Sequence, residues 1–113
     1  MQPDDRVRLL HMIEAAETVS QFVADRRRED LDCDRMLLFA VLRGIEVMGE
    51  AASKVSLRLR ESSPAVPWGA IVGMRNRLIH GYFEINTEVV WNTATQEIPS
   101  LLAELRTLVQ GPS

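Results

Sequence analysis

The sequence predicts an all-α protein built as an up-and-down bundle of four or five helices. Apolar residues recur at three- and four-residue intervals through most of the 113 residues, which is the period of a helix that buries one face. Proline, glycine and serine cluster at a few places and divide these periodic stretches. The sequence contains no alternating apolar–polar run typical of a strand, no internal repeat and no linker. Residues 1–113 are therefore expected to form a single domain.

The first helix is expected from about Asp4 to Arg27. Acidic Asp4 and Asp5 at its start and the arginines 26–28 at its end would complement the helix dipole. We interpret these arginines as a solvated helix end rather than as a guide for RNA, and His11 as non-functional because it has no polar company. The apolar stripe of this helix consists of Leu9, Met12, Ile13, Ala16, Val19 and Val23.

A long second helix is expected from about Asp32 or Asp34 to Arg60. It is apolar on more than one side, so it must be buried on more than one side. In so small a domain, a second subunit is one way to bury the additional side. Gly44 and Gly49 would each weaken this helix by about 1 kcal/mol relative to alanine, and we interpret them as points where neighbouring helices approach closely.

A third helix is expected after a break in residues 61–67, where two prolines and two serines end the long helix. Pro67 could serve as the first residue of this third helix, since its fixed backbone angle suits that position. The helix should stop near His80. Trp68, at its start, is interpreted as a core anchor.

The last helix is expected to begin with Asn86 or Thr87 as its N-cap and to continue to about Gln110. Pro99 should kink it or divide it in two, because proline has no amide hydrogen to donate to the preceding turn. Trp91 is interpreted as a second core anchor.

Composition and charge narrow the classes of function. The formal net charge of -3 argues against a protein that coats nucleic acid through a broad basic field, but it leaves room for a local basic cleft. Cys33 is the only cysteine, so neither an internal disulfide nor a metal site is expected. No apolar run approaches the roughly 20 residues of a membrane span, and residues 1–5 lack the apolar region of a signal peptide. We therefore expect a cytoplasmic protein.

The densest polar constellation in the sequence is the segment from Arg75 to Tyr82. Arginine offers a fixed fork of donors to phosphate oxygens, and histidine can pass a proton near neutral pH. Arg75 and His80 are five residues apart, which on a regular helix separates them by roughly 140°. Asn76 and His80, four apart, would lie side by side. Either the helix ends near His80 or the site is lined from two directions, as a two-fold dimer would allow.

At these residues the chain resembles a known family. The pattern Arg-x4-His-x-Tyr, at Arg75, His80 and Tyr82, resembles the signature of the HepT-like branch of the HEPN superfamily. One departure is the sequence Glu84-Ile85-Asn86, where a Gly-x-Asp-like turn is expected, because it places a negative charge near the motif. Further similar blocks follow the family order over nearly the whole chain, namely 45–52, 66–68, 73–76, 78–83, 90–92 and 98–99.

The resemblance implies a homodimeric helical bundle of HEPN type that acts as a metal-independent endoribonuclease without a cofactor. Such proteins are usually the toxin of a toxin–antitoxin pair, and the substrate would be an RNA, either tRNA or mRNA. By resemblance, Arg75 would bind the scissile phosphate and His80 would move a proton while the 2′-hydroxyl attacks. The implied partner is an MntA-like nucleotidyltransferase antitoxin, which would neutralise the toxin by transferring AMP to Tyr82.

Residues near the motif are candidates for supporting roles. Glu46 and Glu50 lie four residues apart in the long helix, and they form either a solvated salt-bridge ladder or a carboxylate support for Arg75. Asn76 is a supporting candidate, and Arg77 is expected to contact RNA from the rim of the site.

An alternative to the nuclease stays open at this point. The chain could be a non-catalytic helical module that docks on a nucleotidyltransferase and presents Tyr82, or that binds a nucleotide. A ribonuclease toxin should stop cell growth, whereas such a module should be harmless and co-purify with the nucleotidyltransferase.

Overall fold

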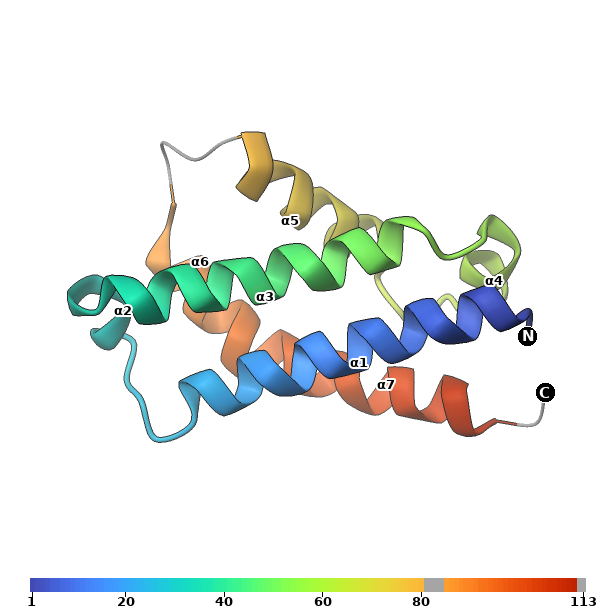
Figure 1. Cartoon of the computed structure of the whole chain (residues 1–113), viewed down its shortest axis with the longest axis horizontal. Helices are drawn as coiled ribbons and strands as arrows, with labels where there is room; N and C mark the ends of the chain where they lie inside the picture. Colours follow the sequence, from blue (N-terminus) through green and yellow to red (C-terminus); the bar gives the residue numbers. More distant parts are fainter. Residues whose placement is uncertain (81–84, 112–113) are drawn as a thin grey trace.

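The computed structural model describes residues 1–80 and 85–111, and of His80 only the helical backbone. Every regular element in this part of the chain is helical (Figure 1), which confirms the all-α prediction. None of these helices is long and apolar enough to cross a membrane. The elements are α1 (Pro3–Val23), α2 (Asp30–Cys33), α3 (Arg35–Ser53), α4 (Leu57–Ser62), α5 (Trp68–His80), α6 (Thr87–Asn92), the π-helical η1 (Thr93–Glu97) and α7 (Ile98–Gln110).

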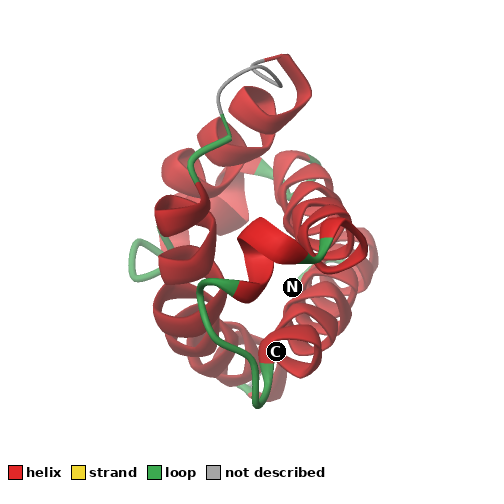
Figure 2. Cartoon of the chain, turned by 90° about the vertical axis from the view of Figure 1, so that its left-hand side faces the viewer, coloured by secondary structure: helices red, strands yellow, loops and turns green. Residues whose placement is uncertain are grey.

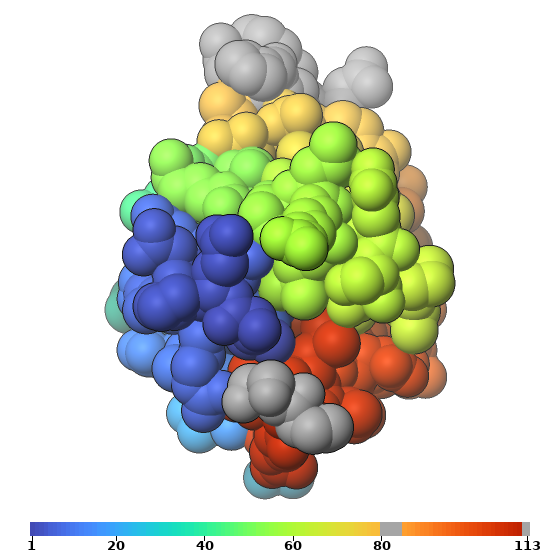
Figure 3. Space-filling view, turned by 90° about the vertical axis from the view of Figure 1, so that its right-hand side faces the viewer, coloured from blue at the N-terminus to red at the C-terminus, as the bar shows by residue number. Residues whose placement is uncertain are grey.

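The long helices form an up-and-down bundle in which α3 is central. It packs against α1 on one side and α5 on the other, and α1 also packs against α7. Successive long helices run in opposite directions, so the two termini lie at the same end (Figure 1). The α4 region covers that end beside the first turns of α1 (Figure 3). At the other end, the last turns of α5 stand away from the rest of the bundle (Figures 1 and 2).

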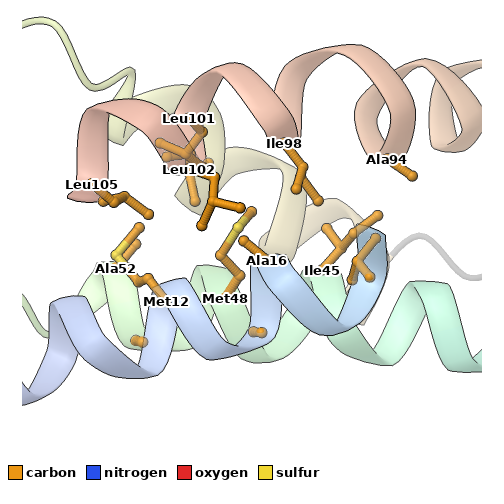
Figure 4. Packing of buried hydrophobic residues seen from close by; sticks show 14 of the residues in the cluster. Met12, Ala16, Ile45, Met48, Ala52, Ala94, Ile98, Leu101, Leu102 and Leu105 are labelled. Carbon is orange, nitrogen blue, oxygen red and sulfur yellow. The ribbon is translucent and has the colours of Figure 1, made fainter. Parts of the chain in front are cut away.

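The core lies between α1, α3 and α7. Fully burying a leucine, isoleucine or methionine side chain contributes about 1.5–3 kcal/mol to stability. The contacts between buried side chains of this kind therefore set the relative positions of the helices. Trp68 is 7% exposed and its indole N–H donates to the Ser63 carbonyl at 3.1 Å, which confirms it as a core anchor, while Trp91 is half-buried. Residues that point toward one another in this core are Met12, Ala16, Ile45, Met48, Ala52, Ile98, Leu101, Leu102 and Leu105 (Figure 4).

The first helix ends earlier than the sequence predicts. It stops at Val23 instead of Arg27, and Asp25 follows with a φ of 61°, in the left-handed region that ends helices. The basic residues therefore come after the helix and do not lie in its last turn.

Arg28 links the segment before α2 to the start of α6. Its guanidinium lies 3.0 Å from Asp32 and 3.3 Å from Glu88, and it also donates to the Thr87 hydroxyl at 3.4 Å. The hydrogen bond to Asp32 raises the pKa of Arg28. The prediction of a purely solvated helix end is therefore wrong for this arginine, which holds two elements together.

The prediction of one long helix to Arg60 is also wrong, because α2, α3 and α4 replace it. The expected start at Asp34 is confirmed for α3, where the Asp34 carboxylate accepts a hydrogen bond from the Leu37 amide at 3.1 Å in an N-cap.

The break between α3 and α4 is stabilised by a distant residue. Ser56 caps α4 by accepting from the Leu59 amide at 3.2 Å. The buried carboxylate of Asp5, in α1, accepts from the Ser56 amide at 2.8 Å and from its hydroxyl at 2.6 Å. Because Asp5 satisfies these donors, the chain can leave the helix at a point where the apolar pattern continues.

The remaining boundaries follow the predictions closely. Helix α5 begins one residue after Pro67, whose carbonyl accepts from the Ile71 amide at 3.1 Å. The Asn86 side chain caps α6, accepting from two amides at 2.9 and 3.2 Å, as expected. Helices α6 and α7 follow one another without a break, joined by the π-helical η1 directly before the turn that contains Pro99, so the chain changes helix type here and does not leave the helix.

Candidate functional site

A groove with a volume of about 400 Å³ lies between α1, α3 and α5, and we call it the Arg75 groove. Four of its described side chains are cationic and two are carboxylates, an excess of two positive charges on a chain whose formal net charge is -3. A concave surface of one sign attracts ligands of the other. The lining consists of Arg8, His11, Arg43, Glu46, Val47, Glu50, Ala51, Lys54, Arg75 and Ile79.

Arg75 is the most constrained cation of this groove. Its side chain is 23% exposed and its guanidinium is paired with the Glu50 carboxylate. A second guanidinium nitrogen donates to the Asn76 side-chain oxygen at 2.7 Å. The buried Nε has no hydrogen-bond partner among the described residues. A buried donor left unpaired costs about 1–3 kcal/mol, so the contacts with Glu50 and Asn76 are what hold the guanidinium in place.

Glu50 fixes the charge balance around Arg75. Its carboxylate also lies 3.6 Å from the Lys54 ammonium. The hydrogen bond from Arg75 lowers the pKa of Glu50 below its ordinary value of 4.5, against the opposing effect of partial burial. Glu50 is therefore ionised at neutral pH and holds the guanidinium in one orientation. Of the two carboxylates considered from the sequence, it is Glu50 that supports Arg75.

Two glycines allow the helices around this groove to approach closely. A β-carbon at Gly49 would collide with the Arg75 β-carbon and would lie 3.2 Å from the Ile71 carbonyl oxygen. A β-carbon at Gly44 would collide with Val19 of α1. The interpretation of both glycines as points of close approach is confirmed, and Gly49 directly determines how near Arg75 lies to α3.

Of the other candidate residues near the motif, some lie at the Arg75 groove and one lies outside it. Glu46 lines the groove and makes no ion pair with another described residue. Asn76 is exposed and contacts Arg75. Arg77 is exposed and does not line the groove. The structure therefore brings Arg75, Asn76, Glu46 and Glu50 together and leaves Arg77 outside.

The remaining motif residues are only partly described. Helix α5 continues through His80, so Arg75 and His80 lie on the same helix about 140° apart. The His80 side chain and residues 81–84, which include Tyr82 and Glu84, lie outside the described residues. Their predicted roles stay predictions.

The sequence analysis missed three residues on the far wall of the groove. Arg8 and His11 of α1 and Arg43 of α3 all line it, so the prediction that His11 lacks polar company is wrong. Arg8 and His11 are three residues apart, which places them on one side of α1. That spacing in the sequence indicated a shared polar face on α1, but it does not show which other helix this face packs against.

A second groove, with a volume of about 500 Å³, lies between α5 and α7 and is floored by α3, and we call it the apolar groove. Glu97 and Glu104 are its charged residues, and no lysine or arginine is among the described residues that line it. Its remaining lining is Ile45, Met48, Ala65, Pro67, Ala70, Ile71, Met74, Thr93, Gln96, Ile98, Ser100 and Leu101.

Comparison with known proteins assigns the chain to a family. Residues 12–108 match the family described as Ribonuclease HepT-like. The chain belongs to this HepT-like family. It is 36% identical over 95 residues to "Probable ribonuclease HepT" of Thermococcus cleftensis, with 84% of this chain and 86% of the relative covered. It is 35% identical over 102 residues to "Putative RNase TTE0752" of Caldanaerobacter subterraneus subsp. tengcongensis, covering 90% and 91%. No solved structure matches significantly.

The HepT-like match confirms the family predicted from the motif in α5. It spans α3 and α5 completely, so Gly49, Glu50 and Arg75 all lie within the matched region. Arg8 lies just before that region, on the wall of the groove that α1 contributes.

Proposed function

We propose that this HepT-like chain is a metal-independent endoribonuclease whose site is the Arg75 groove. The observation that carries the proposal is a half-buried arginine, oriented by Glu50 and Asn76, in a groove whose described side chains carry an excess of two positive charges. The names of the two relatives, which describe ribonucleases, support the same activity. A phosphodiester oxygen is an acceptor that such a fork of donors is suited to bind.

The proposed reaction uses the RNA's own 2′-hydroxyl as nucleophile. The 2′-oxygen attacks the adjacent phosphorus and loses its proton, and the bond to the 5′-oxygen of the next nucleotide breaks as that oxygen gains a proton. Arg75 stabilises the charge that develops on the non-bridging oxygens, and His80 transfers a proton in the reaction. The products are a 2′,3′-cyclic phosphate and a free 5′-hydroxyl.

A two-fold dimer completes the proposed site. Val47 and Ile79, which line the Arg75 groove, are 37% and 39% exposed. Phe39, which is 54% exposed, lines a neighbouring hollow that shares Arg43 and Glu46 with this groove. Large apolar groups gathered on one face are typical of a surface that a partner covers. In the proposed dimer this face meets its own copy, and the grooves of two protomers form one cleft. Arg75 and His80 are about 140° apart on one helix. In the dimer, these residues of both protomers would contribute to one shared cleft.

Regulation is proposed at Tyr82, where a nucleotidyltransferase antitoxin would transfer AMP from ATP to the phenolic oxygen and release pyrophosphate. A tyrosyl–AMP two residues after His80 in the sequence adds negative charge and would repel the RNA backbone. The mass of the protein made together with the nucleotidyltransferase tests this. One or more AMP units that map to Tyr82 support the proposal, and an unmodified protein in an active pair contradicts it.

Cleavage of RNA in excess chelator tests the proposed activity. The wild type should cut. Arg75→Ala and His80→Ala should each lower the rate at least about 100-fold, because the first removes a donor to the developing oxyanion and the second removes the group that transfers a proton. Arg58→Ala is the matched control, since Arg58 is exposed on α4 and lies outside the groove. Equal cleavage by all variants, or dependence on added metal, would sink the proposal. A harmless wild type that binds a nucleotidyltransferase would favour a non-catalytic module.

A further inference from the structure

The wall of the Arg75 groove opposite α5 carries cations that the proposed chemistry does not use. Arg8 comes from α1 and Arg43 from α3, and His11 lies one turn along α1 from Arg8. Arg8 is half-buried and Arg43 exposed. Two arginines from different helices thus share one concave surface with Arg75.

These two arginines differ from most others in their contacts. Neither Arg8 nor Arg43 makes a hydrogen bond or an ion pair with another described residue. Arginines with a described oxygen acceptor are Arg26, Arg27, Arg28, Arg75 and Arg106, which contact carboxylates, and Arg6 and Arg60, which contact backbone carbonyls. Arg35 and Arg58 also have no described oxygen acceptor, but neither lines the Arg75 groove. Two such arginines that share one concave surface with Arg75 point to an anionic ligand.

The shape of this wall favours an extended ligand. A second hollow, with a volume of about 520 Å³, continues along the seam of α1 and α3 and shares His11, Arg43 and Val47 with the Arg75 groove. Phe22, which is 38% exposed, lines the far hollow. Two hollows joined in series suit a strand better than a compact anion. The far hollow is lined by both Arg43 and Glu14, so its formal charges balance, and Phe22 offers an aromatic face on which a base can stack.

We propose that Arg8 and Arg43 form a phosphate-binding subsite that holds the backbone of a single-stranded RNA next to the phosphate bound by Arg75. The inference rests on the proposed function, because it takes RNA to be the ligand of the Arg75 groove. The subsite binds phosphates and therefore reads no sequence. Glu46 is the carboxylate of the groove without a described partner, and it opposes this binding.

Binding of a fluorescent 2′-O-methyl oligoribonucleotide, which cannot cyclise, tests the subsite without cleavage. Fluorescence anisotropy would be followed over a series of KCl concentrations. Arg8→Ala and Arg43→Ala should each weaken binding about tenfold and lower the slope of log K against log salt by about 0.7, the value for one contact to a single strand. Arg58→Ala should match the wild type. Arg43→Lys should retain the salt slope, and Glu46→Gln should bind about two- to fivefold more tightly.

The outcomes separate the subsite from the proposed function. A wild type that neither binds nor cuts RNA contradicts both. A wild type that binds and cuts, with Arg8→Ala and Arg43→Ala unchanged in affinity and salt slope, overturns the subsite and leaves the nuclease in place. Circular dichroism and gel-filtration elution would be measured for each variant. If weaker binding comes only with a changed elution volume, the arginines act in assembly and the subsite is wrong.

Discussion

The two grooves beside α5 are of similar size but differ in charge. The Arg75 groove has a volume of about 400 Å³ and an excess of two positive charges among its described side chains. The apolar groove has a volume of about 500 Å³, and two carboxylates are its charged groups. A single helix serves both, because Arg75 and Ile79 line the first while Ile71 and Met74 line the second.

A hollow of ligand size is therefore not by itself a reactive site. The floor of the apolar groove consists of core side chains such as Ile45 and Met48, which offer neither donors nor protons. The carboxylates Glu97 and Glu104 would repel a phosphate backbone. In the Arg75 groove, by contrast, one guanidinium is oriented by Glu50 and Asn76. Orientation of charge distinguishes the two grooves more than volume does.

The largest expected effect that sharpens this comparison comes from Glu50→Ala. Without its carboxylate partner the Arg75 guanidinium loses its fixed orientation, and cleavage should fall about 100-fold because small misplacements cost that much. Rapid mixing would separate kcat from KM, and kcat should carry most of the loss. Glu104→Ala, in the apolar groove, is the matched control. A loss confined to KM would contradict a positioning role for Glu50.

A somewhat smaller effect is expected from Gly49→Ala. The added methyl would collide with Arg75, so the variant should lose about 1–3 kcal/mol of stability, as overpacked sites do, and should cleave RNA more slowly. Gly73→Ala is the matched control, because a β-carbon at Gly73 meets no atom within 4 Å and alanine favours the helix. Chemical denaturation would measure the free energy of unfolding of both variants. Equal stability of Gly49→Ala and Gly73→Ala would refute the close approach at Gly49.

The smallest expected effect is a pH dependence of stability. The folded-state pKa of Glu50 is lowered, first by its hydrogen bond with Arg75. Its contribution to stability should therefore be present above its ordinary pKa of 4.5 and be lost as the pH falls through the folded value. The Tm of the wild type should exceed that of Glu50→Gln at neutral pH, and the difference should shrink in acid. A difference that grows on acidification has the wrong sign for this account.

Local sequence signals predicted the elements whose determinants are close in the chain. Asp34 and Asn86 cap helices through amides two or three residues away, and both were identified as helix starts. Gly49 was interpreted correctly because a glycine in an apolar helix costs stability unless packing requires it. Arg75 was found because it stands in a dense polar motif.

Contacts between distant residues explain what the sequence could not predict. The long helix breaks before Ser56 because Asp5, 51 residues away, accepts its two donors. Arg8 and Arg43 were missed for the same reason, since only the packing of α1 on α3 brings them into the Arg75 groove. A helical pattern shows which residues share a face, but it does not show what that face meets.

The most direct test of the central claim is the initial rate of RNA cleavage in excess chelator, with one variant in each groove measured beside the wild type. The account predicts that Arg75→Ala loses at least about 100-fold, that Glu104→Gln stays within about twofold, and that the wild-type products end in a 2′,3′-cyclic phosphate. Equal rates for Arg75→Ala and Glu104→Gln would contradict the assignment of the chemistry to the Arg75 groove.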